Sequence, residues 1–388
     1  MTEALRIGIV GLGWMGHAHA RAYARLRHHY LNSALEPVLV AVADNAADDR
    51  LAEAVTAFGF TAVHDDWHAL IERHDLDLVS ITGPNFIHRD VAVAAAEAGK
   101  HIWVEKPAGR HAGETAEIAD AVHAAGVQSA AGFNYRNVPA VELARQLIAD
   151  GRIGAVTSVN IRLLADYAAH PQGALTWRFR NEWAGSGVLG DLVSHGVDLG
   201  RYLVGEITDL VCDRAIFILQ RPQASLAASH FSRGTGGPMG RVENEDYVCA
   251  LLRFEGGARG TLESSRTAVG EQCTYGIEVH GERGALAWDF RRMGELRVCL
   301  DQDYQNASYA THYVAPDDGE LGLFQPGSGI PMGYDDLKVI EAHRLVESIA
   351  TGTPLGATID DAVRAAQLVD ALAESAQDRR WVSCAPVQ

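Results

Sequence analysis

The chain has 388 residues, which is too long for one ordinary hydrophobic core and predicts two domains. Hydrophobic residues make up 47% and charged residues 21%, a balance typical of a folded globular protein rather than a disordered one. The formal net charge of −17 argues against a nucleic acid or an anionic membrane as a partner, because like charges repel.

Three absences in the sequence narrow the class of protein further. There is no signal-peptide pattern and no apolar run as long as a membrane span, so the expected location is the cytoplasm. The five cysteines are scattered and form no C-x-x-C pair, so neither a disulfide framework nor a zinc site is expected. His17 with His19, and His28 with His29, lack cysteine or carboxylate at ligand spacing, and we interpret them as structural or solvated rather than metal-binding.

The first predicted elements are a strand over residues 7–10, a glycine-rich turn, and a helix over residues 18–27. The glycines fall in the pattern G-x-G-x-x-G at Gly11, Gly13 and Gly16. In a dinucleotide-binding turn the first glycine permits the tight turn, the second lets a pyrophosphate approach the backbone, and the third lets the helix pack on the strand. The free N–H groups at the start of such a helix favour an anion.

The second predicted strand, residues 38–43, ends at Asp44. A carboxylate at this point is placed to accept hydrogen bonds from the adenosine ribose of a dinucleotide. The following Asn45-Ala46-Ala47 offers no arginine to balance a 2′-phosphate, so the sequence favours NAD over NADP. The alternative interpretation is an ordinary strand-turn-helix with a surface aspartate.

Four further strands alternate with helical segments up to residue 131, which predicts a parallel sheet covered by helices. They are expected at residues 62–64, 76–82, 101–104 and 127–131. The fold class is therefore α/β, with an N-terminal doubly wound Rossmann sheet. We expect residues 1–131 to form an NAD-binding domain and residues 132–388 to form a domain for substrate binding and oligomerisation.

The second half has longer strands and fewer helices, with polar and apolar residues alternating along several strands. This alternation predicts an α+β domain with an open, mainly antiparallel sheet, covered on one face. The helices are expected at residues 138–149, 336–350 and 360–376. The strands are expected at residues 155–164, 207–219, 246–254, 259–266, 275–280, 285–290 and 295–300.

Two short segments follow strands of the predicted Rossmann sheet, Gly83-Pro84-Asn85 and Glu105-Lys106-Pro107. Ligands of open α/β sheets bind beyond the carboxyl ends of the strands, so both segments are expected at the cofactor edge. The proline after Lys106 restricts the lysine backbone to an extended conformation, which would aim the ammonium group into the cleft. The alternative is a solvated surface lysine.

A glycine- and serine-rich run at residues 185–187 precedes a predicted helix that carries Asp191 and His195. A spacing of four residues puts both side chains on one helical face, where carboxylate and imidazole can act as one proton-transfer unit. Asp198 follows three residues later and could share that face. A surface pair of this spacing, worth a few tenths of a kcal/mol, explains the pattern equally well.

The combination of the glycine turn, Glu105-Lys106-Pro107 and Gly190-Asp191-x-x-x-His195 resembles the Gfo/Idh/MocA family, named after glucose–fructose oxidoreductase and inositol dehydrogenase. The resemblance covers essentially the whole chain. It implies a Rossmann domain followed by an open sheet that forms oligomer contacts in a dimer or tetramer. It also implies oxidation or reduction of a secondary alcohol of a sugar or cyclitol with NAD or NADP.

Residues 175–180 and 184–187 are similar to a family member that oxidises an anhydro-glucose at C3 with NAD. The likeness favours a 3-keto sugar as product, from an anhydrosugar or a glucoside. Ala165 and Tyr167 replace a glutamine and a tryptophan of that member, and this favours the larger glucoside. Three alternatives stay open: an inositol 2-dehydrogenase, a dinucleotide-sensing protein without catalysis, and a glycosidase-like enzyme that oxidises and eliminates.

The resemblance assigns catalysis to Lys106, Asp191 and His195. A histidine base would take the hydroxyl proton, the aspartate would orient it, and the lysine would stabilise the developing alkoxide. The candidate cofactor contacts are Gly11, Gly13, Trp14, Met15, Gly16, Asp44, Asn45, Thr82, Gly83, Asn85, His88, Glu105, Lys106 and Asn134. The candidate contacts of a neutral sugar or cyclitol are Lys106, Tyr135, Asp166, Tyr167, Arg178, Asp191, His195 and Tyr334.

Overall fold

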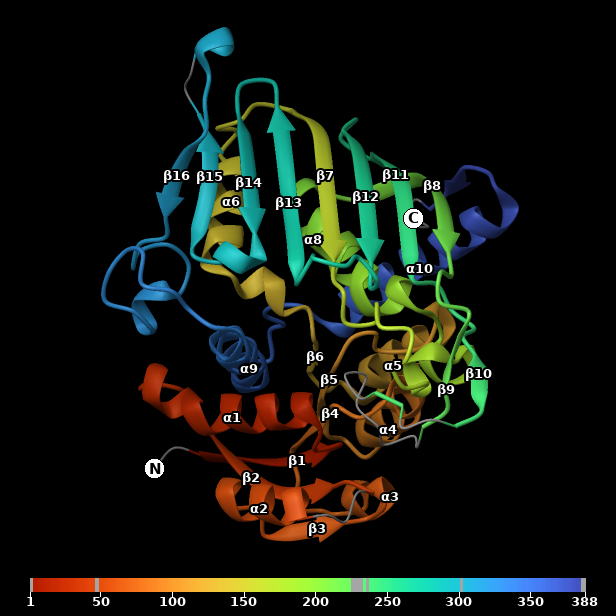
Figure 1. The fold of residues 1–388 in the computed structure, drawn as a ribbon. Helices are drawn as coiled ribbons and strands as arrows, with labels where there is room; N and C mark the ends of the chain where they lie inside the picture. The colour runs from red at the N-terminus through yellow and green to blue at the C-terminus, as the bar shows by residue number, and fades with distance from the viewer. Residues whose placement is uncertain (1–2, 46–48, 225–232, 235–236, 301–302, 385–388) are drawn as a thin grey trace. The chain divides into compact units, whose positions relative to one another are not determined.

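A computed structural model describes residues 3–45, 49–224, 233–234, 237–300 and 303–384 (Figure 1). The chain divides into two compact units. The first comprises Met1–Asn137 with Met332–Arg364, and the second comprises Val138–Pro331 with Ala365–Gln388.

The first unit is built on a six-stranded parallel sheet with the strand order β3-β2-β1-β4-β5-β6. This order confirms the predicted doubly wound Rossmann sheet. All four residues of β4 are buried, as expected for a parallel strand covered on both faces. The strands are β1 (Glu3–Val10), β2 (Leu35–Ala43), β3 (Ala62–His64), β4 (Leu78–Ile81), β5 (His101–Val104) and β6 (Ser129–Ala131).

Helices flank this sheet, and most of them follow the apolar pattern of the sequence. The first helix begins at Trp14, directly after Gly13, and is longer than the pattern predicted. Gly126 ends another helix with a φ of +66°, a backbone conformation that glycine adopts without strain. The helices are α1 (Trp14–His29), α2 (Asp49–Phe58), α3 (Trp67–Ile71), α4 (Asn85–Glu97), α5 (Ala112–Ala125), η1 (Asn134–Asn137) and α9 (Tyr334–Thr351).

Helix α9 packs in the first unit although it lies two hundred residues after the Rossmann strands in the sequence. Arg21 and Arg25 of α1 pair with Asp335 and Asp336 at the start of α9, each at 2.5 Å. The sequence predicts residues 332–364 in the second domain, whereas the structure divides the chain with Met332–Arg364 in the first unit. An apolar helical pattern shows that a helix is buried, but it does not show which core buries it.

The second unit contains a nine-stranded sheet with the order β16-β15-β14-β13-β7-β12-β11-β8-β17. Only the pair β7 and β12 is parallel among the pairs of this sheet in the described residues, which confirms a mainly antiparallel sheet. The strands are β7 (Val156–Leu164), β8 (Ile207–Ala215), β11 (Tyr247–Phe254), β12 (Arg259–Ser265), β13 (Thr274–Gly281), β14 (Ala285–Asp289), β15 (Glu295–Cys299), β16 (Ala310–Tyr313) and β17 (Val382–Ser383).

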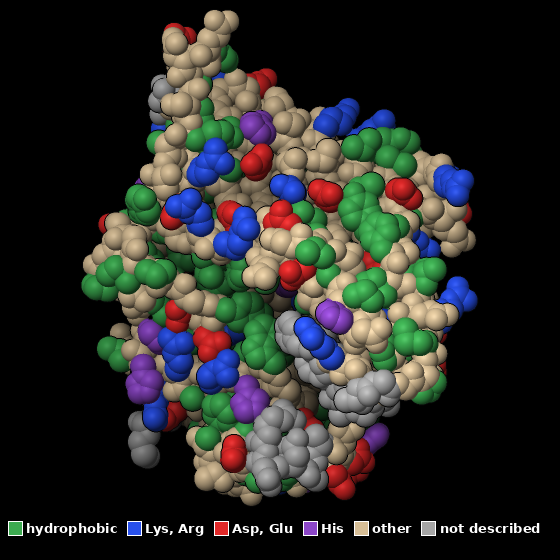
Figure 2. All heavy atoms as spheres, in the orientation of Figure 1, with side chains coloured by type: hydrophobic (Ala, Val, Ile, Leu, Met, Phe, Trp, Pro, Cys, Tyr) green, Lys and Arg blue, Asp and Glu red, His purple; other side chains and the backbone are tan. Residues whose placement is uncertain are grey.

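Helices α6 (Pro139–Ala149) and α8 (Ser194–Val204) lie against one face of this sheet (Figure 1). Gly196 and Gly200 let α8 approach the strands, because a Cβ at these positions would come within 2.6 Å of Leu163 and 3.0 Å of Ile161. Along β11 and β12 buried residues alternate with more exposed ones. The face of the nine-stranded sheet opposite α6 and α8 therefore carries exposed side chains. Figure 2 shows acidic, basic and hydrophobic side chains mixed over that face.

Short elements complete the second unit. The strand predicted over residues 207–219 ends at Ala215, and the short edge strands β16 and β17 carried too few residues to show a pattern. These elements are α7 (Asn181–Ala184), η2 (Trp177–Phe179), η3 (Leu189–Val193), η4 (Phe290–Arg292), η5 (Tyr304–Asn306), η6 (Leu321–Leu323), β9 (Gln220–Pro222) and β10 (Met239–Arg241). The long helix α10 (Ile359–Asp378) begins in the residues of the first unit and continues in those of the second.

Candidate active site

The three glycines of the turn have the three different surroundings that a dinucleotide-binding turn requires. Gly11 has a φ of +88°, and a Cβ there would lie 2.7 Å from the Gly83 backbone. A Cβ on Gly16 would lie 2.2 Å from the Gly11 oxygen, so only glycine lets α1 start this close to β1. No atom lies within 4 Å of a Cβ built on Gly13, which leaves the backbone open to a ligand. The turn fits a pyrophosphate.

Asp44 lies beside the glycine turn at the end of β2. Its Oδ2 accepts a hydrogen bond of 2.6 Å from the Leu12 N–H, inside the turn. Thr82 holds the turn from the neighbouring strand, because its hydroxyl donates to the Gly11 oxygen at 2.5 Å. Asn45 is exposed. Ala46 and Ala47, which follow it and offer no positive charge for a 2′-phosphate, lie outside the described residues. The carboxylate is therefore fixed at the position where the ribose is expected.

We expect kcat/KM to be at least about tenfold higher with NAD than with NADP, a difference of about 1.4 kcal/mol. A 2′-phosphate at about 4 Å from the Asp44 carboxylate is disfavoured by one to several kcal/mol at intermediate dielectric. Steady-state kinetics with both cofactors measures the ratio. Asp44→Asn keeps an oxygen that accepts from the Leu12 N–H and removes the negative charge. This variant should therefore lower the ratio of kcat/KM with NAD to kcat/KM with NADP. A higher kcat/KM with NADP in the unmodified protein would contradict the ribose assignment.

Four predicted ligand contacts lie around this turn and the end of β6. Trp14 is 65% exposed, and its ring lies 5.3 Å from the ring of Tyr334, whose hydroxyl is 3.8 Å from the Met15 sulfur. The Asn134 side chain is fully buried, and neither its amide nitrogen nor its amide oxygen has a partner among the described residues. Unpaired buried amide atoms are destabilising, so a bound ligand is the natural partner for Asn134.

The segments after β4 and β5 meet at one edge of the sheet, as predicted. The two ring nitrogens of His88 lie 2.8 Å from the Gly83 oxygen and 2.9 Å from the Pro107 oxygen, so this buried side chain bridges the two segments. Lys106 is half-buried, and the peptide bond to Pro107 is cis. Asn85, at the first position of α4, is 9% exposed.

The two remaining predicted contacts of the first unit are buried. Tyr135 is 7% exposed, and the Glu105 carboxylate points into the interior, where it contacts His19 and Lys338. The side chain of Glu105 therefore bonds to the protein rather than standing open to a ligand. Its place in the cofactor set was predicted from its position in the chain, and position alone does not give the direction of a side chain.

In the second unit Asp191 and His195 lie on either side of a junction between two kinds of helix. Asp191 belongs to the π-helix η3, in which the Ser194 N–H bonds to the Leu189 oxygen five residues earlier, and His195 belongs to α8. A helix carries both residues, as predicted, but it opens with a π turn that the four-residue spacing does not reveal. Single π turns within helices are rare and occur frequently at functional sites.

The start of the π-helix is held by one buried carboxylate. Glu245 Oε1 accepts hydrogen bonds from the Gly187 N–H at 2.7 Å and the Leu189 N–H at 3.0 Å. A Cβ on Gly187 would lie 2.0 Å from the backbone carbonyl oxygen of Glu245, so only glycine lets the two segments approach this closely. The glycine-rich run before the helix is therefore tightly packed at Gly187.

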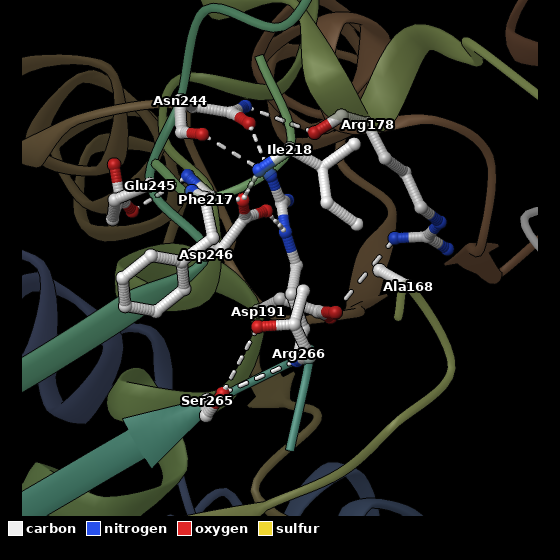
Figure 3. Close-up of polar contacts among 12 residues, drawn as sticks. Ala168, Arg178, Asp191, Phe217, Ile218, Asn244, Glu245, Asp246, Ser265 and Arg266 are labelled. Atoms are coloured by element: carbon white, nitrogen blue, oxygen red, sulfur yellow. Dashed lines mark hydrogen bonds and ion pairs between the residues drawn. The ribbon is translucent and has the colours of Figure 1, made fainter. Parts of the chain in front are cut away.

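Asp191 contacts two of the predicted substrate residues. The Tyr167 hydroxyl donates to Asp191 Oδ2 at 2.5 Å. On its other side Arg178 Nη1 lies 4.0 Å from Asp191 Oδ1 (Figure 3). Burial and the Asp191 charge raise the pKa of Tyr167 well above its usual value, so the hydroxyl stays a donor. The Asp191 side chain remains 28% exposed. Tyr167 and Arg178 thus orient the carboxylate, and their contact with a sugar stays a prediction.

The buried Arg266 is linked through Asn244 to the backbone of Arg178. Arg266 Nε donates to Asp246 at 2.8 Å and its Nη2 donates to the Asn244 side chain at 2.8 Å, while Asn244 donates to the Arg178 oxygen (Figure 3). Phe179 lies between the guanidinium groups of Arg266 and Arg221, with 4.6 and 4.3 Å to the ring centre. Nothing in the sequence pattern predicts this network. The polar run of residues 244–246, directly before the half-buried β11, is the signal that could have pointed to it.

The other predicted residues of the second unit differ in exposure. His195 and Asp198 are 7% and 2% exposed on α8, and Asp166 is half-buried. Lys106 belongs to the first unit, whereas Asp191 and His195 belong to the second. In the described part of the chain, no three histidine, cysteine or acidic side chains gather into a metal-binding group. No helix in the same part is both long and apolar enough to cross a membrane.

Known proteins match both halves of the chain. Residues 5–133 match the family model described as "Oxidoreductase family, NAD-binding Rossmann fold", and residues 141–287 match "GFO/IDH/MocA C-terminal domain". Levoglucosan dehydrogenase of Pseudarthrobacter phenanthrenivorans is 37% identical over 98% of both chains. Myo-inositol 2-dehydrogenase of Thermotoga maritima is 24% identical over 97% of this chain and 98% of its own.

Solved structures agree with these sequence matches. The apo form of levoglucosan dehydrogenase covers 100% of both chains with a TM-score of 0.94 and 36% identity. Its complex with NADH and levoglucosan covers 99% of this chain and 100% of its own, with a TM-score of 0.91. With a Rossmann unit of the expected strand order and matches along its whole length, the chain belongs to the NAD-binding Gfo/Idh/MocA family of oxidoreductases.

Proposed function

We propose that the protein oxidises a secondary hydroxyl group of a sugar or sugar-like polyol to a ketone, with NAD as hydride acceptor. The observation that carries this proposal is the half-buried Asp191 carboxylate, oriented by Tyr167 and Arg178 four residues before His195. An oriented carboxylate four residues before a histidine in the sequence suits proton transfer from an alcohol. An NAD-binding Rossmann unit supplies the matching redox partner.

Each candidate residue has one task in this reaction. His195 takes the proton of the reacting hydroxyl, and Asp191 orients the imidazole and stabilises its charged form. Lys106 donates a hydrogen bond to the reacting oxygen and stabilises its developing negative charge. When bound, NAD supplies the redox chemistry by accepting hydride from the carbinol carbon.

The favoured substrate is an uncharged pyranose of the levoglucosan or glucoside type, oxidised at C3. The likeness to levoglucosan dehydrogenase over 98% of the chain supports a pyranose. The matches to inositol dehydrogenases support cyclitol oxidation as the second candidate. Ala165, where the sequence differs from the anhydrosugar enzyme, is only 3% exposed. The choice between anhydrosugar and glucoside therefore rests on Tyr167, whose hydroxyl reaches Asp191.

The experiment that tests this function is a screen for NADH formation, monitored by absorbance, with levoglucosan, glucosides, inositols and phosphorylated sugars. We expect the highest kcat/KM with an uncharged pyranose and a 3-keto product by NMR. Highest activity with an inositol would favour the second candidate. Oxidation at C1, or activity confined to phosphorylated sugars, would contradict the proposal. Binding of NADH without turnover of any polyol would indicate a dinucleotide-sensing protein.

We also propose that the protein is a homo-oligomer, assembled through the open face of the nine-stranded sheet. Hydrophobic side chains remain exposed on and beside this face, among them Leu251 of β11 at 50% and Trp381 at 40%. The charged residues around them suit a polar rim rather than a buried core. The mass of the protein in solution distinguishes a dimer from a tetramer.

A further inference from the structure

The chain uses lysine at only three positions, although it carries 30 arginines. The three are Lys100, Lys106 and Lys338, and all belong to the first unit. Lys106 is half-buried, whereas Lys100 is 5% exposed and Lys338 is fully buried. An ammonium group is more compact than a planar guanidinium, so the two buried lysines are not interchangeable with arginine.

Lys338 lies in a buried cluster of charged and aromatic side chains. Its Nζ is 2.5 Å from Glu105 Oε1 and 3.0 Å from Glu341 Oε2, and 5.3 Å from the centre of the Trp103 ring. His19 completes the cluster, with its Nε2 at 3.0 Å from Glu105 Oε1 and its ring stacked on Trp103 at 3.5 Å. All five residues are at most 6% exposed.

The charges in this cluster depend on one another. Burial opposes ionisation of Lys338, but Glu105 and Glu341 outweigh it and raise the lysine pKa. Burial would also raise the pKa of Glu105, yet Lys338 and His19 hold it well below its usual range. Burial lowers the pKa of His19 to about 4, so this histidine is neutral near pH 7 and can donate through Nε2. Lys338 is therefore the cation that keeps Glu105 ionised.

Glu105 is bonded at its backbone and its side chain, directly before Lys106. Its N–H donates to the Ile81 oxygen at 3.0 Å, which continues the pairing of β4 and β5. A Cβ on Gly132, directly after β6, would lie 2.6 Å from Glu105 Oε2, so the carboxylate packs closely against the Gly132 backbone. The peptide unit that carries Lys106 therefore starts from a residue fixed in the core.

We propose that Lys338 is a positioning residue that fixes Glu105 and thereby sets the place of the Lys106 ammonium group. The importance of this position rests on the catalytic role proposed above for Lys106. A buried ion pair by itself is weak evidence for stabilisation, because an apolar replacement is often as stable. The location of this pair, next to Lys106 in the sequence and contributed by the distant helix α9, indicates a geometric role.

The test compares Lys338→Met with Lys100→Met in the full-length protein. Lys100 is a matched control, since it is also buried and lies directly before β5, where its Nζ donates to the Arg73 and Leu76 oxygens. Lys106 is the one lysine exposed enough to react with an amine-specific reagent, so its modification rate can be followed by mass spectrometry. We expect Lys338→Met to change this rate severalfold and Lys100→Met to leave it unchanged.

Turnover gives the second readout. We expect kcat of Lys338→Met to fall about 10- to 100-fold, because a displacement of about 1 Å has this effect on a reacting group. NADH affinity should stay within a factor of about three, and Lys100→Met should keep its kcat even if its Tm falls. If Lys338→Met does not fold, Lys338→Met with Glu341→Gln removes one uncompensated carboxylate and is measured in the same way.

Two outcomes would overturn the inference. One is an unchanged modification rate of Lys106 in a folded Lys338 variant, and the other is a change of this rate that is equally large in Lys338→Met and Lys100→Met. Failure of the proposed function gives a different result. If Lys106→Ala kept its turnover, the catalytic role of Lys106 would be lost. The modification rate would then still decide whether Lys338 positions Lys106.

Discussion

His195→Ala is expected to lower kcat by at least about a hundredfold, the usual effect of removing a general base. The side chain is 7% exposed on α8, four residues after an oriented carboxylate, and alanine leaves no group there to accept the hydroxyl proton. The measurement is steady-state NADH formation with the best substrate of the screen. NADH binding, followed by its fluorescence, should survive, because the Rossmann contacts lie in the first unit.

The control for this variant is His123→Ala. His123 is 59% exposed on α5 and pairs with Asp360 at the surface, so its loss should leave kcat within about a factor of two of the unmodified protein. Turnover of His195→Ala close to that of the control would remove His195 from the mechanism. A thermal melt of both variants shows that each is folded.

Lys106→Ala is expected to lower kcat by about 10² to 10³, as found when one donor to a developing oxyanion is removed. The loss should appear in kcat while NADH binding is retained, because the lysine acts on the reacting oxygen. Lys106→Arg should also be impaired, since a guanidinium fork does not reproduce a compact ammonium group. The measurement is kcat and KM with the best substrate, together with the dissociation constant of NADH.

Added ethylammonium provides a further check on Lys106→Ala, because it can restore a cation in the space that the side chain leaves. We expect partial recovery of turnover in this variant and none in His195→Ala. Turnover near the level of Lys100→Met, without added amine, would exclude Lys106 as a partner of the reacting oxygen.

Much of the fold was predictable from local sequence. The six Rossmann strands overlap the residues predicted for them. The signal is clearest at the fully buried β4, because a strand covered on both faces leaves a continuous apolar run. The long strands of the second sheet were also predicted, since alternation marks a sheet with one covered face. The two-residue β17 and the four-residue β16 are too short for either pattern. The π turn at Leu189–Val193 was missed because it depends on Glu245, more than fifty residues later.

Part of the candidate site could likewise be predicted from local sequence, and part depends on contacts between distant segments. The sequence by itself determined where the glycine turn, Asp44 and the segment around Lys106 lie, because their positions follow from backbone geometry at the ends of strands of one sheet. It also placed Asp191 and His195 close together, since they are four residues apart.

Only the tertiary structure decided which distant side chains hold these groups in place. Lys338 reaches Glu105 across 233 residues, and Arg266 reaches Asn244 and Asp246 from the next strand. Such contacts arise where separate segments pack together, and they are favourable only there, because an unpaired buried charge is unstable. A sequence shows a lysine or a glutamate, but the burial that makes the pair necessary exists only in the folded chain.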